Sequence, residues 1–191
     1  MKIASFNINN INRRLTNLLN WLREAEPDIV CLQELKAADA EFPAEAIRQA
    51  GYHAVCRGER RWNGVAILAR WAPVVTRMDL PGDTADGQRR YLEAAVNGVL
   101  VASVYAPNGN PQPGPKFDYK LAWLKRFKAH AAEVYGTGAP VVLAGAYERT
   151  CIWLLSDGRS RHSGSGKRSH WRWHPASPRF QSTQKAALKV A

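Results

Sequence analysis

The chain has 191 residues and a formal net charge of +11 at pH 7. This length suits one domain with a hydrophobic core, or part of one, and argues against two full domains. The charge is uneven: residues 1–148 hold 18 Lys and Arg against 15 Asp and Glu, whereas residues 149–191 hold 9 against 1. A basic excess favours a polyanionic partner, but most of this excess lies in the last quarter of the chain.

Two protein classes are disfavoured by the composition. No apolar run approaches the roughly 18 residues that a membrane span needs, so we expect a cytoplasmic protein with no membrane partner. The three cysteines, Cys31, Cys56 and Cys151, are odd in number and form no CxxC pair. Neither a disulfide framework nor a thiolate zinc site is therefore predicted, and we expect buried thiols at Cys31 and Cys56.

The chain opens with a predicted βαβ unit. Lys2–Asn9 and Asp28–Lys36 each have the pattern of a buried strand that ends in polar residues. Between them, leucines recur at helical spacing from Leu15 to Leu22, and the helix is expected to end before Glu26-Pro27 because proline disfavours helix in the preceding residue.

The middle of the chain is predicted to be rich in short strands. A second amphipathic helix follows Pro43 and stops at Gly51, and β-prone runs occupy 52–55, 65–68 and 74–78. Two longer runs, 91–96 and 99–105, flank Asn97-Gly98, a dipeptide typical of a type I′ hairpin because both residues tolerate positive φ.

The last patterned segments are a loop, a helix and a strand. Residues 107–115 are dense in Pro, Gly and Asn, a long helix with Leu121, Leu124 and Phe127 spaced along it is predicted for 117–134, and 141–144 is a buried strand. From about Arg149 the pattern gives way to Arg, Ser, His and Trp. We therefore divide the chain into a folded part, 1–148, and a basic tail, 149–191, whose composition predicts disorder over most of its length.

The two polar strand ends predict a metal site. Asn7 and Glu34 follow neighbouring strands, so their side chains are expected at the same edge of a sheet. A carboxylate beside an amide offers the hard oxygen ligands that Mg²⁺ takes, on a face left open to a phosphate.

Six segments together resemble a known family. They are Ile3-Ala-Ser-Phe-Asn-Ile-Asn9, Cys31-Leu-Gln-Glu-Leu-Lys36, Gly64-Val-Ala-Ile-Leu68, Gln88-Arg-Arg90, Tyr105-Ala-Pro-Asn-Gly109 and Val141-Val-Leu-Ala-Gly145. In this order, over residues 1 to about 148, they resemble exonuclease III-type apurinic/apyrimidinic endonucleases of the exonuclease–endonuclease–phosphatase superfamily. The resemblance implies an α/β fold: a four-layer sandwich of two packed β-sheets with helices outside, incomplete here because the second half is missing.

The resemblance also implies roles for individual residues. Glu34 would be the principal ligand of Mg²⁺ or Mn²⁺, with Asn7 beside it and Asn9 assisting through water. Tyr105 and Asn108 would contact the scissile phosphate as catalytic residues.

Three basic residues, Arg89, Arg90 and Lys36, would face the DNA. The implied activity is metal-dependent hydrolysis of phosphodiesters 5′ to abasic sites, with 3′-to-5′ exonuclease action. The partner would be double-stranded DNA with abasic sites or 3′ ends, and no stable protein partner is implied.

The match fails at the last strand. The family pattern there is Gly-Asp-x-Asn, whose aspartate is a general-base candidate, whereas this chain reads Gly145-Ala-Tyr-Glu148. The loss of patterning in the middle of a motif suggests truncation or a reading-frame change near codon 146. The coding DNA tests this hypothesis: it fails if neither of the other two frames past Gly145 gives an Asn-containing continuation or second-half sequence.

Three functions therefore remain open. The chain is a nuclease of the exodeoxyribonuclease III type, a non-catalytic nucleic-acid-binding remnant, or an inactive truncated product. Cleavage of an abasic-site duplex with Mg²⁺ separates the first from the other two, and salt-dependent binding without cleavage identifies the second.

Overall fold

The structure is a computed structural model that describes residues 1–147, 150–156 and 185–189. Its strands form two five-stranded sheets, in the orders β10-β1-β2-β4-β3 and β5-β6-β7-β8-β9. The first sheet is built from β1 (Lys2–Asn7), β2 (Ile29–Gln33), β3 (His53–Arg57), β4 (Val65–Ala69) and β10 (Lys185–Lys189). The second is built from β5 (Val74–Arg77), β6 (Tyr91–Val96), β7 (Val99–Tyr105), β8 (Val141–Tyr147) and β9 (Thr150–Ser156).

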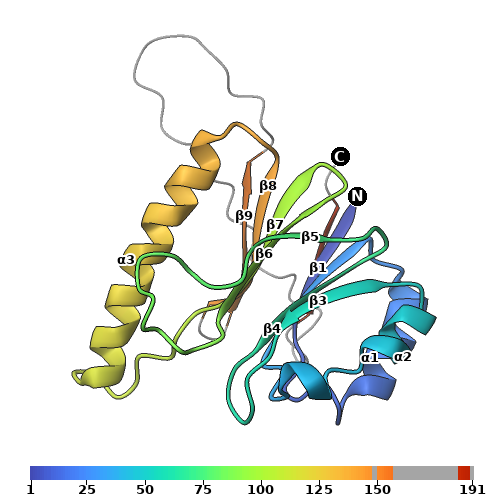
Figure 1. The fold of residues 1–191 in the computed structure, drawn as a ribbon, viewed down its shortest axis with the longest axis horizontal. Helices are drawn as coiled ribbons and strands as arrows, with labels where there is room; N and C mark the ends of the chain where they lie inside the picture. Colours follow the sequence, from blue (N-terminus) through green and yellow to red (C-terminus); the bar gives the residue numbers. More distant parts are fainter. Residues whose placement is uncertain (148–149, 157–184, 190–191) are drawn as a thin grey trace.

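The two sheets pack face to face with helices on their outer sides (Figure 1). Helices α1 (Leu15–Ala25) and α2 (Ala44–Gln49) cover the first sheet, and α3 (Pro115–Gly136) covers the second. Three buried clusters fill the spaces between these layers: one between the sheets around Ile67 and Leu92, one under α1 and α2 around Leu32, and one under α3 around Phe127. The predicted four-layer α/β sandwich is confirmed for the described residues.

Local sequence signals correspond closely to the observed elements. Helix α1 ends at Ala25, just before Glu26-Pro27, and Glu26 adopts the left-handed conformation (φ 45°) that closes the helix. In the β6–β7 hairpin, Asn97 (φ 46°) and Gly98 (φ 79°) both have the positive φ that a type I′ turn requires. A short 3-10 helix, Asp39–Glu41, precedes α2.

Helix α3 buries only part of the expected face. Phe127 is buried as expected, whereas Leu121 is 50% exposed. Trp123, which was not expected to face inward, is buried and stacks on Phe127 with ring centroids 5.4 Å apart. The large aromatic rings cover more of the sheet than a leucine does, and so they decide which stripe of the helix faces inward.

The parallel strand pairs position the functional edge. Strands β1 and β2 run parallel with Asn7 opposite Gln33, and β7 and β8 run parallel with Tyr105 opposite Ala146. The carboxyl ends of both pairs meet at one edge of the sandwich, where side chains of the two sheets reach each other.

Two strands lie within the segment for which disorder was expected. Strand β9 pairs with β8, and β10 pairs with β1. The run Cys-Ile-Trp-Leu-Leu inside β9 is apolar and β-prone, a local signal that the overall composition of the tail obscures. The remainder of the tail, and Glu148, lie outside the described residues.

The structure also bears on the predicted burial of the cysteines and on the expectation of no membrane span. Cys31 is buried as predicted, Cys56 is only partly buried, and both are free thiols. In the part of the chain that the structure describes, no helix is long and apolar enough to cross a bilayer.

Candidate active site

Two side chains, one from each sheet, converge on one oxygen of Glu34. The amide nitrogen of Asn7 donates to Glu34 Oε1 at 2.7 Å, and the phenol of Tyr105 donates to the same oxygen at 2.7 Å. Asn7 ends β1, Glu34 follows β2 and Tyr105 ends β7. The sequence prediction that Asn7 and Glu34 share a sheet edge agrees with this geometry, and the structure adds Tyr105 from the opposite sheet.

The other carboxylate oxygen is held by a lysine. Lys36 Nζ lies 3.0 Å from Glu34 Oε2 and donates to Asn9 Oδ1 at 2.6 Å. Asn9 is tied back to Asn7, because its backbone N–H donates to Asn7 Oδ1 at 3.1 Å. The cluster thus joins every residue expected at the metal site with Lys36, which was assigned to DNA.

The backbone around this cluster is bent sharply. Asn9 (φ 46°), Glu34 (φ 56°) and Lys36 (φ 50°) all occupy the left-handed region, which is uncommon for residues other than glycine. Such conformations persist only where surrounding structure fixes them, and they concentrate at functional sites. Here they direct polar side chains toward the open edge of the sandwich, immediately after β1 and β2 end.

The environment keeps Glu34 ionised and Tyr105 protonated. Partial burial opposes ionisation of Glu34, but the hydrogen bonds from Asn7, Tyr105 and Lys36, with the lysine charge, outweigh it and hold the pKa of this carboxyl below its usual value. Burial, reinforced by the Glu34 anion, raises the pKa of Tyr105 well above its usual value. The site therefore offers an anionic acceptor beside a neutral O–H donor.

Arg90 covers Tyr105 and is itself held by a chain of contacts. Its guanidinium lies 4.9 Å from the centroid of the Tyr105 ring, donates to the Tyr105 carbonyl at 3.3 Å and donates to Gln88 Oε1 at 2.6 Å. The N–H of Gln88 in turn donates to Asp86 at 3.1 Å, and Arg126 of α3 anchors Asp86 at 2.6 Å.

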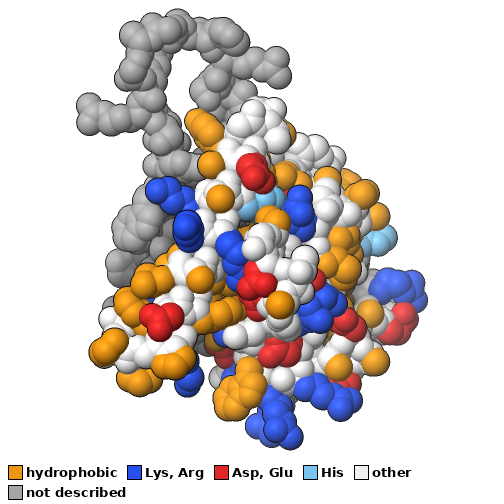
Figure 2. Space-filling model, turned by 60° about the vertical axis from the view of Figure 1, so that its left-hand side comes forward, with side chains coloured by type: hydrophobic (Ala, Val, Ile, Leu, Met, Phe, Trp, Pro, Cys, Tyr) orange, Lys and Arg blue, Asp and Glu red, His pale blue; other side chains and the backbone are white. Residues whose placement is uncertain are grey.

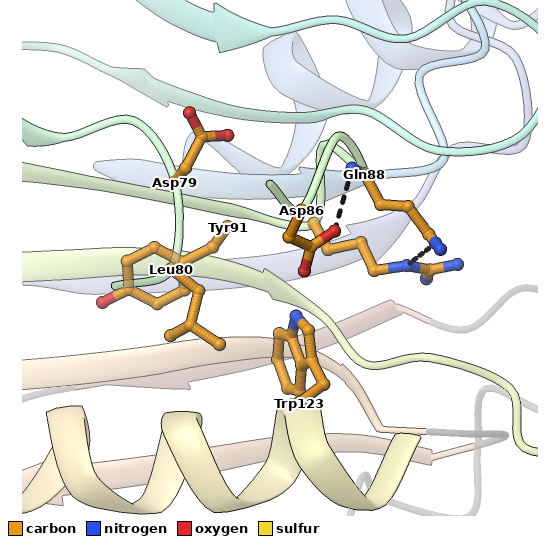
Figure 3. A pocket seen from close by; sticks show the side chains of 7 residues that line it. Asp79, Leu80, Asp86, Gln88, Tyr91 and Trp123 are labelled. Atoms are coloured by element: carbon orange, nitrogen blue, oxygen red, sulfur yellow. Dashed lines mark hydrogen bonds between the residues drawn. The ribbon is translucent and has the colours of Figure 1, made fainter. Parts of the chain in front are cut away.

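A small pocket opens beside this chain of contacts (Figure 3). Its lining residues come from the segment before β6, from β6 itself and from α3: Asp79, Leu80, Asp86, Gln88, Arg90, Tyr91 and Trp123. Because Asp86, Gln88 and Arg90 bind one another, the pocket wall fixes Arg90 over Tyr105.

The remaining predicted residues make their contacts outside the Glu34 cluster. Arg89 Nη1 pairs with Asp79 at 3.2 Å, and Asp79 also holds Arg57 at 2.8 Å. Asn108 is exposed, and its side chain accepts a hydrogen bond from the N–H of Asn110 at 3.1 Å. The structure gives both residues intramolecular partners of their own.

A loop that sequence reasoning did not single out borders the site. Residues 58–64 connect β3 to β4, and the carbonyls of Asn63 and Gly64 accept from the N–H groups of Lys36 and Leu35 at 3.0 and 3.2 Å. Trp62 at its tip is 71% exposed, and the neighbouring Arg60 side chain is 72% exposed. The signal in the sequence was Arg-Arg-Trp between two glycines, of which Gly64 (φ 95°) needs the freedom of glycine.

The end of β8 contrasts with the polar cluster. Ala146 is buried, with its carbonyl accepting from the N–H of Ala106 at 3.0 Å, and it lies opposite Tyr105 in the register. A methyl group therefore occupies the position where the resembled family has an aspartate. Gly145 is required for a separate reason, since a Cβ there would collide with the carbonyl of Val104.

The donor chemistry of the cluster fits a hard divalent cation. Glu34, Asn7 and Asn9 offer carboxylate and amide oxygens, and the Lys36 ammonium already stands among them as a cation. No group of three or more His, Cys, Asp or Glu side chains gathers anywhere in the described ranges. This donor set favours an ion that retains several waters, as Mg²⁺ does, over a fully protein-ligated metal.

Charge is not segregated on the face that carries α3. Figure 2 shows basic side chains interspersed with acidic ones there. This agrees with the near balance of charge over residues 1–148. Anion binding by the folded part would therefore depend on particular residues at the sheet edge and not on a broad basic surface.

Comparison with known proteins finds relatives over most of the described part. The chain is 32% identical over 150 residues to exodeoxyribonuclease III of Haemophilus influenzae, covering 76% of this chain and 56% of that protein. Its structure is similar to that of the 3′ phosphatase NExo from Neisseria bound to a product DNA hairpin, with 40% identity, a TM-score of 0.73, and coverage of 76% and 56%.

An AP endonuclease from Archaeoglobus fulgidus is also similar, with 35% identity, a TM-score of 0.72, and coverage of 76% of this chain and 56% of that one. The chain spans about half the length of the curated relatives it matches. The Endonuclease/Exonuclease/phosphatase family matches residues 4–145, which include every member of the Glu34 cluster. This chain belongs to that family.

Proposed function

We propose that this chain derives from a DNA-repair nuclease of the exodeoxyribonuclease III type, and that its Glu34 cluster is the metal- and phosphate-binding part of the active site. The observation that carries the proposal is the convergence of Asn7 and Tyr105 on Glu34 at the open edge of the sandwich. The activity would be hydrolysis of DNA phosphodiesters 5′ to abasic sites, with 3′-to-5′ exonuclease action. The three relatives named above support this class of reaction.

Glu34 and Asn7 would hold Mg²⁺ or Mn²⁺, with Asn9 assisting through water. The ion would supply Lewis-acid polarisation of a phosphoryl oxygen and stabilisation of the leaving oxygen. Glu34 suits this role because its environment keeps it ionised at neutral pH.

When DNA binds, Tyr105 would turn its single O–H from Glu34 to an oxygen of the scissile phosphate. Its phenol remains protonated because burial and the nearby Glu34 anion raise its pKa, so it can stabilise developing negative charge without itself ionising. Arg90, stacked on the ring, would keep the phenol in position and add positive charge beside the phosphate. Asn108, exposed on the loop after β7, would contact the same phosphate.

DNA would lie along the edge that carries these residues. The 58–64 loop projects an exposed tryptophan and arginines next to the site, a combination suited to phosphate contacts and apolar contacts with nucleotides. Arg89 and Lys36 would contact the phosphate backbone of the DNA. The NExo relative was solved with a product DNA hairpin, which supports DNA as the partner.

Turnover by this chain should be slow because Ala146 cannot accept a proton. Losing a general base typically costs about 10²- to 10⁴-fold in rate. Metal and DNA binding depend on other residues and should survive. The second candidate function, a non-catalytic DNA binder, is favoured by this same substitution.

The test is incubation of the full chain with an abasic-site duplex and Mg²⁺, with Ala146→Asp and Ala146→Asn as matched variants. We expect salt-dependent DNA binding by all three proteins and faster cleavage only with Ala146→Asp, since an amide cannot act as a base. Cleavage should disappear in Glu34→Gln. If wild type, Ala146→Asp and Ala146→Asn all bind DNA and none of them cleaves it, the non-catalytic binder is favoured; if none of them binds or cleaves, the chain is an inert product.

A further inference from the structure

The DNA contact that the proposed function gives to Lys36 does not explain where its ammonium lies. Lys36 was assigned to DNA, yet its Nζ lies between two oxygens of the site, 3.0 Å from Glu34 Oε2 and 2.6 Å from Asn9 Oδ1. The side chains of Lys36 and Glu34 are only 25% and 18% exposed, so water screens this pair less than it screens a surface ion pair.

With this ammonium in place, both oxygens of Glu34 are occupied. Oε1 accepts from Asn7 and Tyr105, and Oε2 faces Lys36. A divalent cation that binds Glu34 and is assisted by Asn9 needs the oxygens that the ammonium contacts. Two cations cannot share this space at low cost, because their mutual repulsion is weakly screened in a partly buried site.

We propose that Lys36 is the internal counter-ion of the metal site, and that a divalent cation binds only by displacing its ammonium from Glu34 and Asn9. This inference rests on the proposed function in so far as Glu34 is the metal ligand. Lys36 would thereby keep the cluster assembled without metal and would set the threshold concentration at which metal enters.

The surrounding geometry allows this exchange without rearranging the backbone. The Lys36 N–H is fixed by the carbonyl of Asn63 at 3.0 Å, which holds the main chain in its left-handed turn. The ammonium sits at the end of a flexible four-carbon stem, so it can leave while the turn stays in place. Asn7 and Tyr105 continue to orient Glu34 after the ammonium has left.

The test is a Mn²⁺ titration of the full chain without DNA, in which electron paramagnetic resonance measures the free Mn²⁺ at each step. Lys36→Met should bind Mn²⁺ about threefold to tenfold more tightly than wild type, as expected for removal of a partly buried ion pair. Lys36→Arg, which keeps the charge, should remain within about twofold of wild type.

Lys128→Met is the matched control, because Lys128 is exposed on α3 and its replacement removes the same charge from the chain. It should leave Mn²⁺ affinity within about twofold of wild type. Thermal melting gives a readout independent of affinity. Without metal, Lys36→Met should melt below wild type, and saturating Mn²⁺ should raise its melting temperature by more than it raises that of wild type.

Failure of this inference is distinguishable from failure of the proposed function. If Glu34→Gln abolishes Mn²⁺ binding but Lys36→Met binds no more tightly than wild type or Lys128→Met, Lys36 is not the counter-ion and the metal site stands. If Glu34→Gln binds Mn²⁺ as wild type does, the metal site itself is wrong. Lys36→Gln replaces Lys36→Met in the same titration if the latter does not fold.

Discussion

Two glutamates of this protein have nearly the same hydrogen-bonding environment in two different regions. Glu34, at the mouth of the sandwich, accepts from the phenol of Tyr105 at 2.7 Å and from Asn7 at 2.7 Å, and pairs with Lys36 at 3.0 Å. Burial raises its pKa and the three partners lower it, and the partners prevail.

Glu93, on β6 beneath α3, reproduces the pattern in the interior. It accepts from the phenol of Tyr91 at 2.7 Å and from Thr76 at 2.7 Å, and faces His130 Nε2 at 2.9 Å. Its pKa is also lowered, by His130, Tyr91 and Thr76 acting against burial. Its side chain is only 5% exposed, against 18% for Glu34.

The comparison shows that a perturbed carboxylate alone does not mark a functional site. Both glutamates have tyrosine donors and lowered pKa values, but only Glu34 lies at a strand end that faces solvent. A ligand can exchange with the partners of Glu34, whereas Tyr91 and His130, two of the three partners of Glu93, are enclosed between a sheet and a helix. We therefore expect Glu93 to serve stability and Glu34 to serve binding.

The largest expected effect is on stability, from Glu93→Ala. It should lower the free energy of unfolding by about 3–5 kcal/mol, because Tyr91 and His130 lose their acceptor inside the core. Urea denaturation measures this, with Glu45→Ala as the control. That variant removes an exposed ion pair between Glu45 and Arg48 on α2 and should leave the urea midpoint nearly unchanged. A loss below about 1 kcal/mol for Glu93→Ala would mean that the interior cluster is energetically unimportant.

The same conservative change at both glutamates separates the two roles. Glu34→Gln should weaken Mn²⁺ binding by more than about tenfold while changing stability by less than about 1 kcal/mol, since the amide keeps its shape at a solvated edge. Glu93→Gln should leave Mn²⁺ binding nearly unchanged and should lower stability by more than about 1 kcal/mol. If the two variants changed Mn²⁺ affinity and the urea midpoint equally, Glu34 and Glu93 would not have the different roles, binding and stability, that we assign to them.

Removing a tyrosine hydroxyl should have a smaller effect. Tyr91→Phe should cost about 1–2 kcal/mol, because its partner is fully enclosed, and Tyr105→Phe about 0.5–1 kcal/mol, because water can replace its O–H at the mouth. Thermal or urea unfolding of the two single variants ranks them. A greater loss from Tyr105→Phe would show that the mouth cluster is the more tightly coupled of the two.

The smallest expected difference is in acid stability. A carboxyl whose pKa is lower in the folded than in the unfolded chain stabilises the fold above its unfolded pKa and loses that contribution as pH falls through the folded value. The usual glutamate value is 4.5, and the pKa of Glu93 lies below it. Urea midpoints between about pH 3 and about pH 6 should therefore fall less steeply with acid in Glu93→Gln than in wild type. Parallel slopes would contradict the assignment.

Local signals predicted those features that depend on neighbours in the chain. The Asn97-Gly98 hairpin and the end of α1 before Glu26-Pro27 required only backbone preferences. The adjacency of Asn7 and Glu34 followed from the βαβ topology, because the ends of parallel neighbours share an edge.

Long-range packing could not be read from the same signals. Periodicity predicted α3 but not that Trp123 would face inward while Leu121 would stay half exposed, because several stripes of that helix are partly apolar. The pairing of Arg89 with Asp79 and the stacking of Arg90 on Tyr105 join segments whose relative positions only the packed sheets define.

The sequence by itself determined the order of strands and helices, the identity of the polar residues at the strand ends, and the family resemblance, which in turn implied the four-layer fold. These depend on residue type and spacing along the chain. Only the tertiary structure decided that Tyr105 crosses from the second sheet to Glu34, that the Lys36 ammonium turns inward to the same carboxylate, and that Glu93 and His130 meet under α3. Each of these contacts spans sheets, a tight left-handed turn or a helix–sheet interface, where distances depend on packing and not on local propensity.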